Sequence, residues 1–296
     1  MRRLNRQSFL GPTSDAVLAG ATIGIVGLGG GGSHIAQQAG HAGIGGFVLV
    51  DPQEIDNTNT NRLVGSTLAD VDACTTKTAI AARTIRSINP DARILKIQKS
   101  WQDATDTLKA CDIIIGAVDS FREREQLERF ARRYLIPYID IGMDVHDLGE
   151  KAFLISGQVI LSTPGNPCLR CCGVITDERL QREAERYGTA GGNPQVVWPN
   201  GVLASTASGL AVKILVPWHR FVPAFAYLEY DGNKGTVTVS NRVAIIDEKP
   251  CKHHPADETG DPTFDIRAHL KSLASREAVV PEAGWWNRLW RRCLSR

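Results

Sequence analysis

The sequence lacks the features that would place it among nucleic-acid-binding, membrane or secreted proteins. Its net charge is only +2 at pH 7 over 296 residues, whereas a general nucleic-acid binder carries a strong basic excess. No apolar run approaches the roughly 20 residues that a helix needs to cross a bilayer. The arginines at positions 2, 3 and 6 are not followed by the apolar core of a signal peptide. We therefore expect a cytoplasmic protein with no membrane span and no nucleic-acid partner.

The composition is otherwise that of a soluble globular protein, with 43% hydrophobic and 22% charged residues. Its length allows one large domain or two small ones, and no internal repeat or low-complexity tract is present. There are seven cysteines. In a cytoplasmic protein we expect these to be free thiols or metal ligands, because disulfides are rare in that compartment.

The first recognisable unit is a strand, a glycine loop, a helix, a second strand and a carboxylate. The strand is expected at 23–26, the glycines fill 27–32, the helix covers 33–42, and the second strand, 47–50, ends at Asp51. Glycines let the backbone turn sharply and approach a phosphate, and a helix N-terminus offers free N–H groups. This order predicts a nucleotide-binding βαβ unit.

Strands and helices continue to alternate after this unit. Further strands are expected at 93–98, 112–118 and 136–141, with helices at 75–87 and 121–134. Such alternation predicts a Rossmann-like α/β fold with a mostly parallel sheet covered by helices. After residue 144 the pattern changes. Segments 151–162, 225–230 and 236–240 look like antiparallel strands, and helices are expected at 178–187 and 200–216.

Polar residues that suit a phosphate site follow two of the expected strands, 47–50 and 112–118. Asn59 and Arg62 lie in the loop after Asp51, three positions apart, so that both can lie on one side of a turn. Lys77 lies near the start of the expected helix 75–87. Asp119 lies at the carboxyl end of the expected buried strand 112–118. Ligands bind at the carboxyl ends of strands in open α/β sheets, and a carboxylate there can hold Mg²⁺.

The glycines at 27, 29 and 32 match G-x-G-x-x-G, which also occurs in nicotinamide-dependent oxidoreductases. That alternative needs a proton relay for a carbonyl. The histidines near these loops are His34 and His41, in the glycine helix, and we interpret them as surface or packing residues.

Five segments in order carry a more specific resemblance. They are RLNRQ at the start, GLGGGGS, DPQEIDNTNTNR, the lysine helix that ends in NP, and AVDSFRER. Together they resemble the HesA/MoeB/ThiF family of ATP-dependent adenylyltransferases, which includes the ubiquitin-activating enzymes. The resemblance implies adenylation of the C-terminal carboxylate of a ubiquitin-like or sulfur-carrier protein, with release of pyrophosphate.

The resemblance also implies a role for each matching residue. The loop glycines Gly27, Gly29, Gly30 and Gly32 would cradle ATP, Asp51 would hold the ribose, and Asn59, Arg62 and Lys77 would contact the triphosphate. Asp119 would bind magnesium, and Arg6 would reach the phosphates of the other subunit of a homodimer. The spacing between Arg62 and Lys77 is about two residues longer than the family pattern.

A second cluster has the spacing of a zinc site. Cys168-x-x-Cys171 and Cys251-x-x-His254 would supply four ligands of a structural Zn²⁺. Cys172 or His253 could replace one of them, and free buried thiols are the alternative. The resembling family carries two C-x-x-C pairs at this place.

The segment 176–198, which would cross over the active site, contains no cysteine. Many activating enzymes carry their acceptor thiol there, and in this chain Val197 takes its place. Cys172 and Cys74 are the remaining candidates. We therefore expect either an enzyme that stops at the adenylate or a relay to a partner's thiol.

The expected organisation is an N-terminal arm (1–20), an adenylation domain (21–257) and a tail (258–296) with a Trp/Arg-rich end. Within the domain, 21–144 would bind the nucleotide, and 145–257 the carrier and zinc. Three further segments resemble stand-alone activating enzymes of bacterial ubiquitin-like conjugation systems. They are IDIGM, PGNPCLRCCG and PQVVWPNGVLAS. Such activating enzymes work with a conjugating enzyme, often in antiviral defence.

Overall fold

The computed structural model describes residues 4–185, 194–218, 221–246, 251–255, 258–260 and 265–278. The chain divides into two compact units, Met1–Pro262 and Thr263–Arg296. The second unit contains helix α9 (Ile266–Ala278), and the aromatic and basic end of the tail lies outside the described residues.

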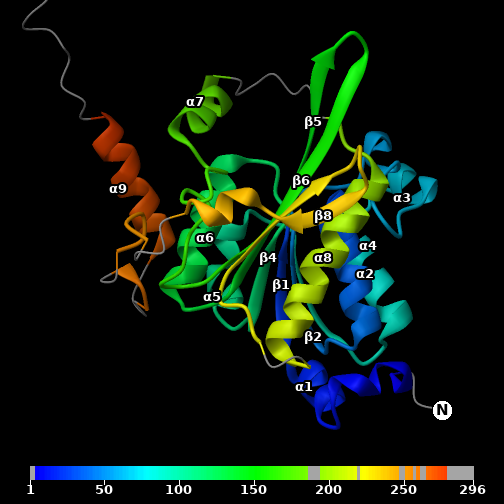
Figure 1. Cartoon of the computed structure of the whole chain (residues 1–296). Helices are drawn as coiled ribbons and strands as arrows, with labels where there is room; N and C mark the ends of the chain where they lie inside the picture. Colours follow the sequence, from blue (N-terminus) through cyan, green and yellow to red (C-terminus); the bar gives the residue numbers. More distant parts are fainter. Residues whose placement is uncertain are drawn as a thin grey trace, which may run out of the picture. The chain divides into compact units, whose positions relative to one another are not determined.

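The first unit is built on one eight-stranded sheet, with the order β3-β2-β1-β4-β5-β6-β7-β8 (Figure 1). The first five strands in this order are parallel, and β6, β7 and β8 continue the sheet antiparallel. The strands are β1 (Thr22–Val26), β2 (Gly46–Val50), β3 (Arg93–Ile97), β4 (Ile113–Gly116), β5 (Tyr138–Gly149), β6 (Ala152–Ser162), β7 (Ala226–Asp231) and β8 (Thr236–Val239). The predicted Rossmann-like sheet with an antiparallel extension is confirmed.

Helices cover both faces of the sheet (Figure 1). On one face lie α2 (Gly30–Ala42), α4 (Lys77–Ile88) and α8 (Val197–Leu215), and on the other lie α5 (Thr105–Leu108) and α6 (Phe121–Arg133). The shorter elements are η1 (Asn5–Leu10), α1 (Ser14–Gly20), η2 (Asn57–Asn59), α3 (Leu68–Asp72), η3 (Trp101–Ala104), α7 (Asp177–Glu185) and η4 (Asn241–Ala244). No helix in the described part of the chain is both long and apolar enough to cross a membrane.

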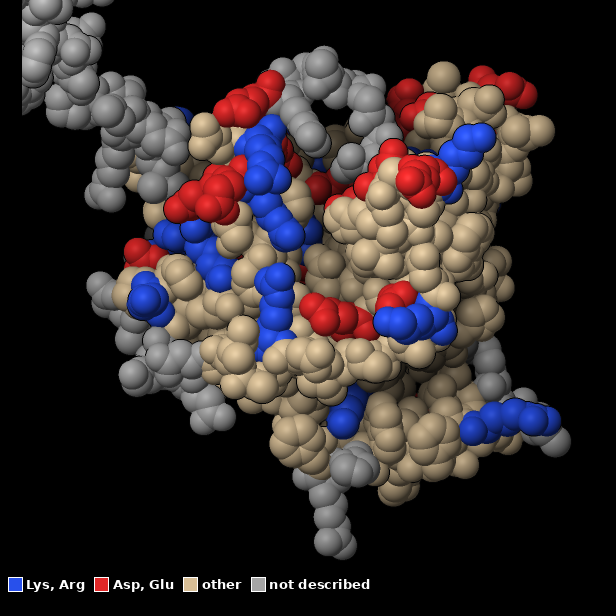
Figure 2. All heavy atoms as spheres, turned by 45° about the horizontal axis from the view of Figure 1, so that its top comes forward, with Lys and Arg blue, Asp and Glu red and all other residues tan. Residues whose placement is uncertain are grey.

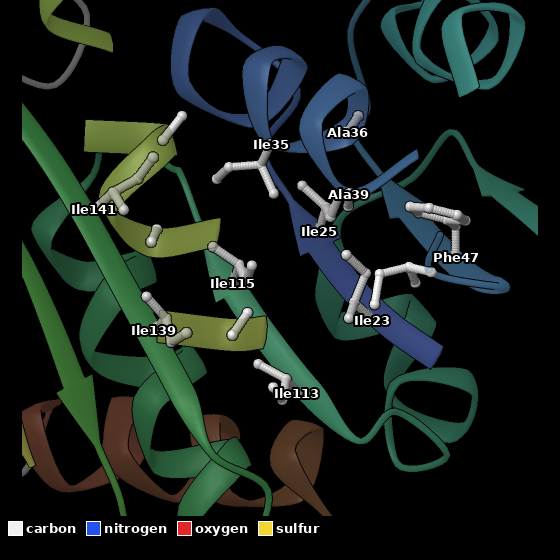
Figure 3. Close-up of a cluster of buried hydrophobic side chains, with 14 of the residues drawn as sticks. Ile23, Ile25, Ile35, Ala36, Ala39, Phe47, Ile113, Ile115, Ile139 and Ile141 are labelled. Atoms are coloured by element: carbon white, nitrogen blue, oxygen red, sulfur yellow. The ribbon is translucent and has the colours of Figure 1, made fainter. Parts of the chain in front are cut away.

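The core between the sheet and this first helical layer follows from strand alternation, because every second residue of a strand faces the same side. Figure 3 shows pairs of isoleucines from three neighbouring strands, with Ile35, Ala36 and Ala39 of α2 beside them. The pairs are Ile23 with Ile25, Ile113 with Ile115, and Ile139 with Ile141, all almost fully buried. Each buried isoleucine stabilises the fold by about 1.5–3 kcal/mol, so this layer anchors the strands that carry the site.

Strand β5 extends well beyond its predicted end at residue 141. It pairs with β6 as far as Gly149 opposite Ala152, with an irregularity between Asp147 and Gly149. The two strands form a long hairpin that projects past the rest of the sheet (Figure 1). The outer part of β5 is mostly exposed, and the ladder with β6 supplies the backbone hydrogen bonds that extend the strand. Because β5 crosses position 144, the two predicted halves share one sheet.

Candidate active site

The carboxyl ends of the parallel strands open into a cleft of about 2100 Å³. Its walls are the loops after β1, β2 and β4 together with one face of β5 to β8. Basic and acidic side chains surround a hollow on this side of the molecule (Figure 2). The residues of the predicted nucleotide site that line the cleft are Gly27, Gly29, Gly30, Asp51, Asn59, Arg62, Lys77 and Asp119.

The glycine loop needs its glycines for two different reasons. Gly27 has a positive φ of 85°, and a Cβ there would lie 2.5 Å from the carbonyl oxygen of Ala117. A Cβ on Gly32 would lie 1.9 Å from the carbonyl oxygen of Gly27. Gly32 is therefore needed so that the backbone of the loop can pack closely against Gly27. Gly32 does not line the cleft, and its predicted contact with the nucleotide stays a prediction. At Gly29 nothing lies within 4 Å of a Cβ, which leaves room for a ligand.

Asp51 is buried and joins the second strand to the glycine loop. Its Oδ2 accepts a hydrogen bond from the backbone N–H of Leu28 at 2.7 Å, and its Oδ1 accepts one from the N–H of Gln53 at 2.9 Å. An ionised carboxylate has about four acceptor sites. Asp51 can thus fix the loop and still accept a ribose hydroxyl.

Two cations of the predicted nucleotide site are held by neutral oxygens. Arg62 NH1 donates to the carbonyl of Thr58 at 2.7 Å and to Asn61 Oδ1 at 2.9 Å. Lys77 Nζ donates to Gln53 Oε1 at 2.6 Å. Within the described residues neither cation forms an ion pair with a carboxylate, so their charges remain available to a polyanion.

Asn59 lies between these cations in a short 3-10 turn. Asp56 caps the turn, since its Oδ1 accepts the N–H of Asn59 at 3.1 Å, while the N–H of Arg62 donates to the carbonyl of Asn59 at 3.0 Å. The predicted turn with Asn59 and Arg62 on the same cleft is therefore present.

Asp119 follows β4 and lies just before the N-terminus of α6. Its Oδ1 accepts a hydrogen bond from Gln195 Nε2 at 3.0 Å, a contact from the start of the α8 segment that the sequence did not predict. Glu183 of α7 accepts the N–H groups of Phe121 and Arg122, each at 3.0 Å. An exposed carboxylate facing a phosphate site is a donor that suits Mg²⁺, which is usually held by one or two carboxylates together with substrate phosphates.

Arg6 lies far from this cleft. The side chain of the neighbouring Gln7 donates from Nε2 to the carbonyl of Ala42 at 3.0 Å, at the C-terminal end of α2. The cleft is at the opposite end of that helix, which has 13 residues and spans about 20 Å. Arg6 is exposed and cannot reach the cleft of its own chain.

The cysteine cluster is a compact group under the cleft. The Sγ atom of Cys171 lies 3.6 Å from those of Cys168 and Cys251. The Nδ1 atom of His253 lies 3.5, 3.4 and 3.7 Å from the sulfurs of Cys168, Cys171 and Cys251. Tetrahedral zinc with ordinary bond lengths would separate two sulfurs by about 3.8 Å and a sulfur from a nitrogen by about 3.6 Å. The donor set therefore fits Zn²⁺.

The fourth member of this cluster is His253 and not His254, the residue chosen from the sequence. His254 Nε2 lies 3.6 Å from Glu128 Oε2. Glu128 is itself buried and accepts hydrogen bonds from Ser162 Oγ and from the N–H of Leu169. The turn at 252–254 decides which ring meets the thiols, and the C-x-x-H spacing alone does not contain that information.

The thiols outside the cluster differ in exposure. Cys172 and Cys111 are buried, and burial raises the pKa of both thiols, that of Cys111 to about 12. Cys74 is exposed but does not line the cleft, and Cys293 lies outside the described residues. Neither buried thiol has the properties of an acceptor nucleophile.

His34 has the packing role that its position in the glycine helix suggested. A Cβ on Gly201 of α8 would lie 3.3 Å from its ring, and burial lowers the pKa of His34. The ring therefore fills the contact between α2 and α8.

The cleft combines a glycine loop, a carboxylate after the second strand and an acidic residue after the fourth. With Arg62 and Lys77, which have no carboxylate partner in the described part of the chain, these features define a Rossmann-like nucleotide-binding protein. Residues 2–252 match the model of the ThiF family, so the chain belongs to that family. This match confirms the family that the five sequence segments indicated.

Two curated relatives share part of this chain. It is 27% identical over 164 residues to the SAMP-activating enzyme E1 of Haloferax volcanii, covering 55% of this chain and 57% of the relative. It is 22% identical over 264 residues to ubiquitin-like modifier-activating enzyme 5 of Culex quinquefasciatus, covering 80% of this chain and 63% of the relative. The chain thus spans about three fifths of the length of these relatives.

Solved structures share the fold. E. coli MccB with ATP superposes with a TM-score of 0.65 at 21% identity, covering 81% of this chain and 72% of that one. The microcin C7 biosynthetic enzyme MccB in complex with N-formylated MccA gives a TM-score of 0.68 at 22% identity, with coverage of 81% and 72%.

Proposed function

We propose that this protein uses ATP to adenylate the C-terminal carboxylate of a ubiquitin-like or sulfur-carrier protein. The observation that carries the proposal is the position of Asn59, Arg62, Lys77 and Asp119, which line one cleft with the glycine loop. The relatives named SAMP-activating enzyme and ubiquitin-like modifier-activating enzyme support the carrier class.

The chemistry fits this residue set. A C-terminal carboxylate is already ionised at neutral pH, so no general base is needed. One of its oxygens attacks the α-phosphorus, the bond from that phosphorus to the bridging oxygen breaks, and pyrophosphate leaves with its electron pair. The site must therefore neutralise a triphosphate and align two anions. Arg62 and Lys77 provide charge, and the glycine loop with the N-terminus of α2 provides N–H donors.

Asp119 would hold the magnesium ion that, when bound, neutralises phosphate charge. Arg6 would serve the cleft of a second subunit in a homodimer, because its own cleft is out of reach. Cys168, Cys171, Cys251 and His253 would bind a structural zinc. A closed set of four ligands leaves no open position for catalysis, so the zinc would stabilise the carrier-binding half.

The tail of the carrier would lie across the antiparallel end of the sheet. Residues that line the cleft form two rows across the strands. Gly142, Gln158, Glu229 and Thr238 are register partners, and so are Asp144, Ser156, Asp231 and Thr236. The first row lies nearer the nucleotide site and would receive the end of the tail. The structure of MccB in complex with N-formylated MccA is a neighbour in fold that was solved with its peptide partner.

The buried state of Cys172 and Cys111 favours an enzyme that stops at the adenylate or relays the acyl group to a partner's thiol. A cytoplasmic conjugation system of bacterial ubiquitin-like type, with a separate conjugating enzyme and a role in antiviral defence, is the setting we propose. A nicotinamide oxidoreductase is the alternative, and no observation in the cleft favours it.

The test is ATP–pyrophosphate exchange with candidate carrier proteins encoded beside this gene. We expect exchange that requires one of these carriers and its free C-terminus. A non-reducing gel then tests for a thioester. An adduct that dithiothreitol cleaves and that Cys172→Ala abolishes would overturn the preference for an adenylate-only enzyme.

A further inference from the structure

Arg124 is a buried cation at the floor of the cleft. Its side chain is 5% exposed and forms a paired contact with the fully buried Asp140, through Nε to Oδ1 at 2.9 Å and through NH2 to Oδ2. Tyr138 donates its hydroxyl to Asp140 Oδ1 at 3.1 Å. The guanidinium carbon also lies 5.5 Å from the centre of the Phe121 ring. Arg124 is therefore fixed in one orientation before any ligand arrives.

One edge of this guanidinium has no partner. Arg124 donates from Nε and NH2 to Asp140. Within the described residues its NH1 makes no hydrogen bond. Arg124 nevertheless lines the cleft, so its remaining donors face a space that a ligand can enter. A guanidinium edge that is fixed in place and open to the cleft beside a phosphate site suits an anionic acceptor.

The surroundings of NH1 indicate where that acceptor would lie. A Cβ built on Gly142 would be 3.1 Å from Arg124 NH1 and 2.6 Å from the side-chain amide of Gln158. Two polar groups thus converge on Gly142, where β5 has no side chain. Within the described residues the Gln158 amide also has no hydrogen-bond partner. Both groups line the same cleft as Asp119.

The geometry points to Arg124 and Gln158 as the site that binds the reacting carboxylate of the carrier. This inference rests on the proposed function and identifies the atoms that receive the acyl end. Planar guanidinium donors match a carboxylate. The charge of Arg124 is balanced by Asp140, so the pair offers donors without holding the anion by net charge.

The same donors can serve both sides of the reaction. Before the attack they would hold one carboxylate oxygen while the other forms the bond to the α-phosphorus. Afterwards the held oxygen is the carbonyl of the mixed anhydride, which still accepts hydrogen bonds. Gly142 would allow the tail backbone to approach closely, because any side chain there would displace NH1 and the Gln158 amide.

The experiment compares the wild-type protein with Arg124→Lys, which keeps a positive charge near Asp140 but lacks the planar guanidinium donors. A second variant, Gly142→Ala, keeps Arg124 and Gln158 but adds a Cβ that would lie 2.6 Å from the Gln158 amide and 2.9 and 3.1 Å from NH2 and NH1 of Arg124. Arg122→Lys is the matched control, since Arg122 is exposed on the same helix and does not line the cleft. The probe is the carrier that supports exchange by the wild-type protein, in its carboxylate form and with a C-terminal carboxamide.

We expect the wild-type protein to bind the carboxylate form at least about 10-fold more tightly than the carboxamide. Arg124→Lys and Gly142→Ala should reduce this preference to about 2-fold or less and raise the KM for the carrier, while the Kd for ATP changes by less than about 2-fold. Arg122→Lys should behave as wild type. A purely structural role would not remove the carboxylate preference selectively.

Either variant that folds, binds ATP and keeps the full carboxylate preference would overturn the assignment of Arg124 and Gln158. Failure of the proposed function gives a different result, because the wild-type protein itself would then show no carrier-dependent exchange. The melting temperature of each variant, measured alongside, separates loss of folding from loss of binding.

Discussion

The cleft and the cysteine–histidine cluster use polar residues in opposite ways. In the cleft, Arg62, Lys77 and the free edge of Arg124 are positioned by neutral or already balanced partners and direct donors into open space. In the cluster, three sulfurs and the His253 ring face one another at 3.4 to 3.7 Å. We propose that the first region binds a substrate in each reaction cycle, whereas the second holds a permanently bound metal ion.

Glu128 shows how the second region is joined to the fold. Its carboxylate accepts the N–H of Leu169, the hydroxyl of Ser162 and a contact from His254. Through these contacts α6, β6 and both ends of the cluster meet at one buried group. From this contrast we expect substitutions in the cleft to lower activity with little effect on thermal stability. Substitutions in the cysteine–histidine cluster should instead lower thermal stability.

The largest expected effect is on activity. Arg62→Ala should lower kcat/KM for ATP–pyrophosphate exchange by about 10²- to 10³-fold, because it removes charge that stabilises the transition state. Its melting temperature should stay within about 1 °C of wild type, since Arg62 is only half-buried and forms no ion pair among the described residues. Arg86→Ala, a change at an exposed arginine of α4 outside the cleft, is the control. A large drop in melting temperature for Arg62→Ala would contradict the claim that cleft residues contribute to activity and not to stability.

The next effect is on stability. Removal of zinc with a chelator, or Cys171→Ser, should destabilise the fold by at least about 3 kcal/mol, which corresponds to roughly 6–12 °C in melting temperature. Cys74→Ser changes an exposed thiol outside the cluster and should retain both zinc and stability. Purified protein that contains no zinc, measured by mass spectrometry, would contradict this assignment.

A sharper test separates the two histidines. His253→Ala should lose bound zinc, whereas His254→Ala should retain it and lose about 1–3 kcal/mol of stability because Glu128 loses a partner. Zinc content and thermal melting of both variants give the result. Equal zinc loss in both, or zinc loss only at residue 254, would favour the ligand set chosen from the sequence.

The smallest effect depends on pH. The hydrogen bond from Arg83 holds the pKa of the buried Asp70 carboxyl well below its usual range, and this pair joins α3 to the helix that carries Lys77. A lowered pKa means that the stabilisation is present above about pH 4 and is lost as the pH falls further. Asp70→Asn should therefore cost about 1 kcal/mol at pH 7, since Arg83 is half-exposed. Urea melts at pH 7 and pH 3 should show the difference shrinking at the lower pH.

Much of the fold could be predicted because each layer has a local signal. The apolar runs at β1, β2 and β4 and the glycines between β1 and α2 identify the nucleotide-binding half without tertiary information. The outer part of β5 mixes apolar and charged residues, most of them exposed, and contains no apolar run. It forms a strand because β6 pairs with it along the hairpin.

The candidate site divides in the same way. Asp51, Asn59, Arg62 and Asp119 follow the ends of strands, so their meeting in one cleft follows from the topology of a parallel sheet. The role of Arg124, on α6, could not be recognised, because it depends on a contact with Asp140 of β5 that only the folded structure creates. The choice of His253 over His254 depends on a single turn.

The central claim is that the cleft activates a carboxylate with ATP. The most direct measurement is isotope exchange between pyrophosphate and ATP in the presence of a candidate carrier with a free C-terminus. We predict exchange that disappears when the carrier is omitted, when its C-terminal carboxylate is converted to an amide, or when Asp119 is changed to Asn. Tight binding of a nicotinamide dinucleotide, together with no exchange for any carrier tested, would contradict the account.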